Sequence, residues 1–119
     1  MSDFTLFHNP RCSKSRAALA LLERRGIEPV IVDYLKNPPS AAELRAVIAK
    51  LGIRPEELVR KGEETYKSTY AGKSLSDAEW IEAMSRHPIL IERPILVRGK
   101  YAVLGRPTEN IEQFLEHKA

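Results

Sequence analysis

The sequence predicts an α/β fold: a mixed four-stranded sheet with flanking helices and an inserted helical layer. Three observations carry this prediction. A strand, a helix and a second strand follow one another at the N-terminus, and this βαβ order implies parallel pairing with a right-handed crossover. About 50 residues of helical pattern come next, more than a simple connection needs. Two strands joined by a two-residue turn and a last helix complete the order β-α-β-α-α-α-β-β-α.

Length and composition agree with one compact unit. The chain has 119 residues, of which 43% are hydrophobic and 29% charged, and these values are ordinary for a globular domain. We expect a single domain over residues 1–119, with the helical insertion at about 36–88. The longest apolar run has six residues (17–22), far below the ~20 that span a bilayer, and no signal-peptide pattern opens the chain. We therefore expect a soluble, cytoplasmic protein that is a monomer.

The first half of the sheet is predicted from residues 4–7 and 30–34, two apolar or β-branched runs flanked by turn residues. The helix between them begins near Ser13 and ends at Gly26, where a left-handed backbone is natural. Its predicted apolar face consists of Ala17, Ala18, Leu21 and Leu22.

The insertion contains two capping boxes, in which a serine is followed three residues later by a glutamate. Ser40 with Glu43 and Ser76 with Glu79 each precede an apolar pattern of helical period. Residues 54–60 predict a further short helix, because a proline stands at its first position. Tyr66 and Tyr70 are expected to pack rather than to stack on a ligand.

The second half of the sheet is predicted from residues 95–98 and 101–104. Gly99-Lys100 between them is a turn of the Gly-X type, which implies antiparallel pairing. The last helix is capped by Thr108 and presents Ile111, Phe114 and Leu115 on one face.

Cysteine usage restricts the chemistry more than any other number. Cys12 is the sole cysteine, so the chain forms no internal disulfide, no Cys-x-x-Cys couple and no cysteine-rich zinc site. Any thiol chemistry must therefore finish on another molecule.

Cys12 lies where a strand ends and a helix begins. Free backbone N–H groups and the positive end of the helix dipole favour the thiolate there. Arg11, Lys14 and Arg16 flank the cysteine, and together they account for the net charge of +3. We predict a lowered thiol pKa; the alternative is a buried, inert cysteine.

The same helix start is a candidate anion site. Its first amides, with the hydroxyls of Ser13 and Ser15 and the neighbouring Lys14, can receive an oxyanion. Nucleophile and anion site coincide, which indicates thiolate attack on the central atom of an oxyanion. His8 could modulate the thiol or simply hold the loop.

Three arginines are further candidates for oxyanion binding. Arg93 precedes the predicted hairpin and Arg106 follows it, so both could reach the same edge of the sheet. Considered alone, each could equally be a surface arginine, and the setting of Arg60 favours a solvated one.

Other site classes are not supported. Residues 71–74 match the end of a phosphate-binding loop, but Lys67 stands where its first glycine is required. His87 and His117 have no partner at metal-ligand spacing, so we expect no metal. The mild charge does not require a nucleic-acid partner, and we expect neither a nucleic-acid nor a membrane partner.

Four segments in this order resemble the glutaredoxin-coupled arsenate reductase family, whose fold is thioredoxin/glutaredoxin-like with an inserted helical layer. The segments are residues 8–16 (His-Asn-Pro-Arg-Cys-Ser-Lys-Ser-Arg), Arg60, Arg93-Pro94-Ile95 and Gly105-Arg106-Pro107. The resemblance implies that Cys12 is the nucleophile, that Arg60, Arg93 and Arg106 bind the oxyanion, and that His8 and Ser15 support the thiolate. It also implies that Asn9 belongs to the active-site loop and that Pro94 is a cis-proline beside it.

The implied activity is reduction of arsenate to arsenite, with no bound cofactor and with glutathione and glutaredoxin as thiol partners. These external thiols would replace the missing second cysteine. Two alternatives stay open: a Spx-like regulator that binds RNA polymerase, against which Ser15 counts because such regulators often use Cys-x-x-Cys, and a general glutathione-linked thiol oxidoreductase.

Overall fold

The structure, a computed structural model, describes residues 3–106 and 108–117. It divides the chain into two compact units, Met1–Asn37 with Arg93–Ala119 and, separately, Pro38–Glu92. The second unit nearly coincides with the helical insertion predicted at about 36–88. That the whole chain is one domain stays a prediction, and Pro107 lies outside the described residues.

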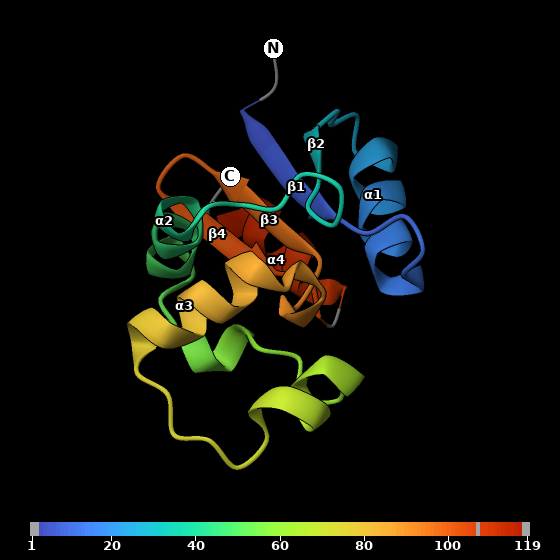
Figure 1. Ribbon diagram of the computed structural model, residues 1–119. Coiled ribbons are helices and arrows are strands. Elements are labelled where there is room, and N and C mark those ends of the chain that lie inside the picture. The colour runs from blue at the N-terminus through green and yellow to red at the C-terminus, as the bar shows by residue number, and fades with distance from the viewer. Residues whose placement is uncertain (1–2, 107, 118–119) are drawn as a thin grey trace. The chain divides into compact units, whose positions relative to one another are not determined.

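The first unit contains the predicted mixed sheet (Figure 1). Its strands are β1 (Phe4–His8), β2 (Val30–Asp33), β3 (Ile95–Arg98) and β4 (Tyr101–Leu104), in the order β2-β1-β3-β4. β1 pairs with β2 in parallel, whereas β1–β3 and β3–β4 are antiparallel. The predicted fold class and both strand pairings are confirmed.

Helices α1 (Ser13–Arg24) and α4 (Glu109–His117) pack on one face of this sheet. The core that they share with β1 and β3 consists of Phe4, Leu6, Ala18, Leu21, Leu22, Leu96, Ile111 and Phe114. Gly26 follows α1 with φ +75°, as its place after the helix predicts. The prediction for Ala17 was wrong: it is exposed, and the buried residues of α1 are Ser15, Ala18, Leu21 and Leu22.

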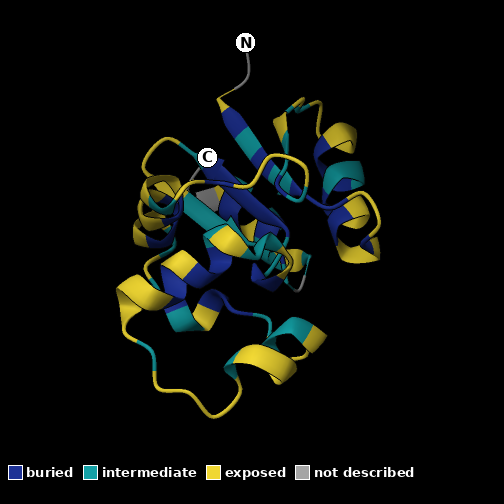
Figure 2. Ribbon diagram, viewed as in Figure 1, coloured by how far each residue is buried: buried dark blue, intermediate teal, exposed yellow. Residues whose placement is uncertain are grey.

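The strands differ in burial, as Figure 2 shows. In β1 every second residue is buried, which is the pattern of a central strand with one face against a core. β2 lies at the edge of the sheet, and Val30 and Ile31 are 50% and 44% exposed although both are β-branched.

The second unit is helical. α2 (Ala41–Leu51) and α3 (Asp77–Arg86) both begin with the predicted capping boxes, in which each serine side chain accepts a hydrogen bond from the glutamate amide three residues on. The segment predicted as a helix over 54–60 is a shorter 3-10 helix, η1 (Pro55–Leu58).

The remaining short helices of this unit are η2 (Tyr66–Tyr70), a π-helix, and η3 (Pro88–Leu90), a 3-10 helix. Tyr66 and Tyr70 pack against the buried Trp80, with ring centroids 6.2 and 5.9 Å apart. These contacts agree with the packing role expected for both tyrosines. Within residues 3–106 and 108–117, no helix is long and apolar enough to cross a membrane.

Candidate active site

The loop between β1 and α1 is held by its own hydrogen bonds. The Asn9 side-chain oxygen accepts from the Arg11 amide at 3.0 Å, and the Asn9 carbonyl accepts from the Cys12 amide at 3.0 Å. The Arg16 guanidinium donates to the Pro10 carbonyl at 3.0 Å. These bonds make a compact turn that places Cys12 at the N-cap of α1.

Cys12 is only 8% exposed, and its environment favours the thiolate. Burial of the sulfur raises its pKa, but the amides of Ser15 and Lys14 and the Arg106 guanidinium together outweigh this effect, so the pKa is lowered. The Cys12 side chain makes no N-cap hydrogen bond to the helix. The amides of Ser15 and Lys14 instead lower the pKa by stabilising the thiolate. The direction of the shift is the one predicted from the helix start.

Arg106 is fixed in its position beside the sulfur. One terminal nitrogen of its guanidinium lies 3.9 Å from Cys12 Sγ, and its Nε donates to the Arg93 carbonyl at 2.9 Å. Asn110 of α4 donates to the carbonyls of Arg106 and Leu104 at 3.0 and 3.2 Å. The segment after β4 is therefore tied both to the loop before β3 and to the last helix.

His8, at the end of β1, and Ser15, in the first turn of α1, form a buried hydrogen-bonded pair. His8 Nδ1 and Ser15 Oγ are 2.6 Å apart, and Ser15 Oγ also accepts from the Asn9 amide at 3.0 Å. Burial lowers the pKa of His8, the Asp33 carboxylate opposes this and Arg16 adds to it, with a net lowering. The Ser15 side chain thus ties β1 to the first turn of α1, while its backbone amide acts on Cys12.

Arg93 and Pro94 lie in the segment directly before β3. The Arg93–Pro94 peptide bond is cis, as the resemblance implies. Arg93 Nε is buried and has no hydrogen-bond partner within residues 3–106 and 108–117. Gly105 donates to the Pro94 carbonyl at 2.8 Å, so the segments that carry Arg93 and Arg106 run together. A buried guanidinium nitrogen without a partner is a donor available to an anion.

Arg60 belongs to the second unit. Its guanidinium forms ion pairs with Glu63 at 3.2 Å and Glu92 at 3.4 Å, and its amide donates to the Leu90 carbonyl at 2.7 Å. Arg60 is thus a paired rather than a solvated arginine. Its contact with an oxyanion stays a prediction.

The chain matches known proteins over most of its length. The family model described as the ArsC family matches residues 7–114. The chain belongs to the ArsC family. A protein of Neisseria meningitidis named arsenate reductase is 44% identical over 117 residues, covering 97% of this chain and all of the relative. One of Haemophilus influenzae with the same name is 46% identical over 112 residues, covering 92% and 97%.

The fold agrees with a solved structure of the family. The arsenate reductase from Vibrio cholerae superimposes on this ArsC-family chain with a TM-score of 0.87 at 45% identity, covering 92% of this chain and 95% of the other. The thioredoxin-like fold class and the resemblance inferred from the motifs are confirmed.

Among the predicted site residues of this ArsC-family protein, the first unit brings one set together. Cys12 meets Arg106 and the amides of Lys14 and Ser15, while the Ser13 and Lys14 side chains are exposed on the first helical turn. In the part of the chain that the structure describes, no three His, Cys, Asp or Glu side chains are grouped to hold a metal.

Two residues that shape the site were missed from the sequence. Asp33 pairs in register with His8, because both end neighbouring parallel strands. That shared position is a sequence signal that could have identified Asp33, since the carboxyl ends of parallel strands meet at one edge. Asn110 offers no such signal, because its role depends on how α4 packs.

Proposed function

We propose that this protein is an oxidoreductase that reduces arsenate to arsenite, with Cys12 as the nucleophile. The observation that carries the proposal is the coincidence of a thiol with a lowered pKa and anion-binding groups at one point, the N-terminus of α1 beside Arg106. The names of its relatives in Neisseria meningitidis and Haemophilus influenzae support the same substrate.

The oxyanion would be held by arginine, lysine and serine side chains. Arg106 is already beside Cys12, and the buried Nε of Arg93 has a free donor among the described residues. Arg60, Ser13 and Lys14 complete the proposed set. Arginine suits this role because its planar donors match tetrahedral oxyanions.

The reduction needs two electrons, and a protein with one cysteine cannot supply them alone. The Cys12 thiolate attacks arsenic(V) and an arsenate oxygen leaves as water, which forms a Cys12–S–As bond. Glutathione adds its sulfur to the same arsenic, with loss of a second water. A glutaredoxin thiolate then attacks the glutathione sulfur, the S–As bond breaks, and its electron pair reduces arsenic(V) to arsenic(III). Hydrolysis of the remaining bond releases arsenite and the Cys12 thiol.

His8, Ser15 and Asn9 are proposed as positioning residues. Their buried hydrogen bonds fix the first turn of α1, whose amides favour the thiolate, and any displacement of that turn would move those amides away from the sulfur. Pro94 holds the neighbouring segment through its carbonyl. We also propose that the protein works as a cytoplasmic monomer without a bound cofactor.

A coupled assay of arsenate-dependent glutathione oxidation tests the function. We expect turnover that requires arsenate, glutathione and glutaredoxin, and its loss in Cys12→Ser. Lys100→Gln is a matched control, because Lys100 lies in the β3–β4 turn, at the end of the sheet away from His8. Arsenate reduction by Cys12→Ser at the parent rate would refute the mechanism. Glutathione oxidation that does not depend on arsenate would instead favour a general thiol oxidoreductase.

A further inference from the structure

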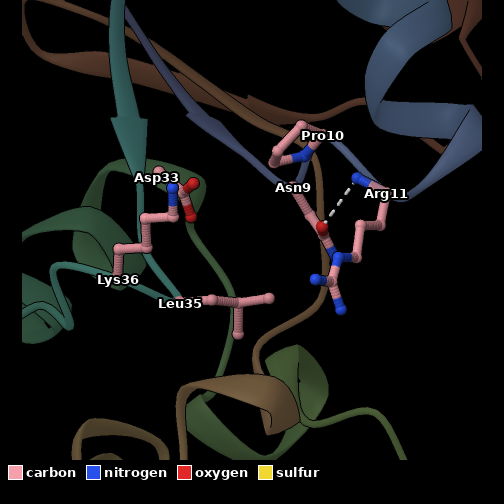
Figure 3. Close-up of a pocket in the computed structure, with 6 residues that line it drawn as sticks. All are labelled: Asn9, Pro10, Arg11, Asp33, Leu35 and Lys36. Atoms are coloured by element: carbon pink, nitrogen blue, oxygen red, sulfur yellow. Dashed lines mark hydrogen bonds between the residues drawn. The ribbon is translucent and has the colours of Figure 1, made fainter.

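A pocket opens beside the cysteine loop, within the first unit. It has a volume of about 330 Å³ and is lined by Asn9, Pro10, Arg11, Asp33, Leu35 and Lys36. Figure 3 shows the loop residues on one side and, on the other, Asp33 at the end of β2 with Leu35 and Lys36 just after it; Leu35 and Arg11 extend toward each other. Pockets that bind small molecules enclose about 300–1,000 Å³, so this one suits a small ligand.

The loop side of the pocket is already rigid. Asn9 and Arg11 are joined by the 3.0 Å hydrogen bond drawn in Figure 3, and the Pro10 carbonyl is held by Arg16. Cys12 follows Arg11 directly, and adjacent Cα atoms are about 3.8 Å apart. A ligand seated against Arg11 therefore lies one residue along the chain from Cys12, which does not itself line the pocket.

The charges of the lining select a class of ligand. Arg11 and Lys36 supply two cations, and neither has an ion-pair partner within residues 3–106 and 108–117. Asp33 supplies one carboxylate, while Pro10 and Leu35 supply apolar surface. Two cations and one anion complement a molecule with two carboxylates, one ammonium group and an apolar stem.

We propose that this pocket is the subsite for the peptide thiol that donates electrons, a small γ-glutamyl peptide of the glutathione class. Arg11 and Lys36 would hold its two carboxylates and Asp33 its ammonium group, leaving the central cysteine free to reach the arsenic on Cys12. The subsite rests on the proposed function for its role, but its binding can be measured without any turnover.

The test uses S-methylglutathione, which keeps both carboxylates and the ammonium group but cannot react. Titrated into the isotope-labelled protein, it should shift the backbone amide signals of Asn9, Arg11, Leu35 and Lys36. Lys36→Gln and Arg11→Gln should each weaken its binding about two- to fivefold, the size of one exposed ion pair. Lys100→Gln should leave the affinity unchanged.

A second measurement separates peptide recognition from thiol chemistry. In the coupled assay with fixed glutaredoxin, Lys36→Gln should raise the glutathione concentration for half-maximal rate by the same factor and leave that for arsenate unchanged. With neutral 2-mercaptoethanol in place of glutathione, the variant and the parent should respond alike, because this thiol offers no carboxylate.

The outcomes distinguish the subsite from the function. Arsenate reduction without any signal shift at the pocket would overturn the subsite and leave the proposed function standing. Shifts at the pocket in a protein that does not reduce arsenate would support the subsite and overturn the function. If Lys36→Gln changed only the glutaredoxin concentration needed for half-maximal rate, the subsite would be overturned, since the pocket would then face the protein partner.

Discussion

Arg106 should control how much of Cys12 is ionised, because its guanidinium lies 3.9 Å from the sulfur. At that distance a charge pair is worth about 1 kcal/mol with the dielectric constant of water and about 4 kcal/mol with an effective value of 20. Arg106 is half-buried, so partial screening favours the lower figure. About 1 kcal/mol corresponds to about a fivefold change in an equilibrium constant. We therefore expect Arg106→Gln to reduce the thiolate population at least about fivefold.

Alkylation by iodoacetamide measures this population directly. The reagent is uncharged, so Arg106 does not steer it, and Cys12 is the sole cysteine, so the label reports one site. Below the pKa of the thiol, the rate is proportional to the thiolate fraction. The comparison of parent and Arg106→Gln should therefore be made at several pH values between about 5 and 7.

Two further variants make the result specific. Lys100→Gln removes the same charge at the far end of the hairpin and should react at the parent rate. Arg106→Lys keeps the charge but loses the fork that also donates to the Arg93 carbonyl, so an intermediate rate is expected. Equal alkylation of parent and Arg106→Gln would mean that the helix amides alone stabilise the thiolate, and the charge argument would be wrong.

Three further predictions concern stability. Burial lowers the pKa of His8, so the folded state favours the neutral imidazole. The resulting stability is fully present above the ordinary histidine pKa of about 6.5 and is lost as the pH falls below it. In urea unfolding, the free energy of unfolding of His8→Gln should therefore decline less steeply over that range than that of the parent. Gly105→Ala would place a methyl group 2.8 Å from Ile111 Cδ1 and should lower the free energy of unfolding by about 1–3 kcal/mol, whereas Gly62→Ala, with nothing within 4 Å, should not; equal values for both would refute the packing argument. Ser76→Ala removes the hydrogen bond that caps α3 and should cost about 1 kcal/mol in the same measurement, and an unchanged midpoint would show that the cap is not needed.

Much of the fold could be predicted because its signals are local. Capping boxes at Ser40 and Ser76 and the turn at Gly99 depend on a few neighbouring residues, and the structure reproduces each of them. The exposure of Ala17 could not be predicted in this way. Ser15 is the buried residue of that turn because its hydroxyl bonds to the end of β1, and such a contact depends on tertiary packing.

The site residues likewise differ in whether a local sequence signal identifies them. Cys12 could be identified because a cysteine at a strand–helix junction has a predictable electrostatic environment. Asn110 could not, because it acts through the carbonyls of a segment that only packing brings near it. The pocket depends on the register of β1 and β2, which brings residues 9–11 beside residues 33–36. The sequence motif around Cys12 does not show which residues the neighbouring strand β2 brings beside it.

The polar groups around Cys12 separate into two sets with different consequences for pH. The Ser15 hydroxyl and His8, which could exchange protons with a thiol, are hydrogen-bonded to each other, and Ser15 Oγ also accepts from the Asn9 amide. The groups that lower the pKa of Cys12 are instead the amides of Ser15 and Lys14 and the Arg106 guanidinium, and His8 is not among them. Ionisation of the thiol should therefore follow its own pKa, little altered by protonation of His8. His8 then acts on the reaction through the position of the helix rather than through its charge, so Arg106→Gln should shift the pH profile of alkylation more than His8→Gln does.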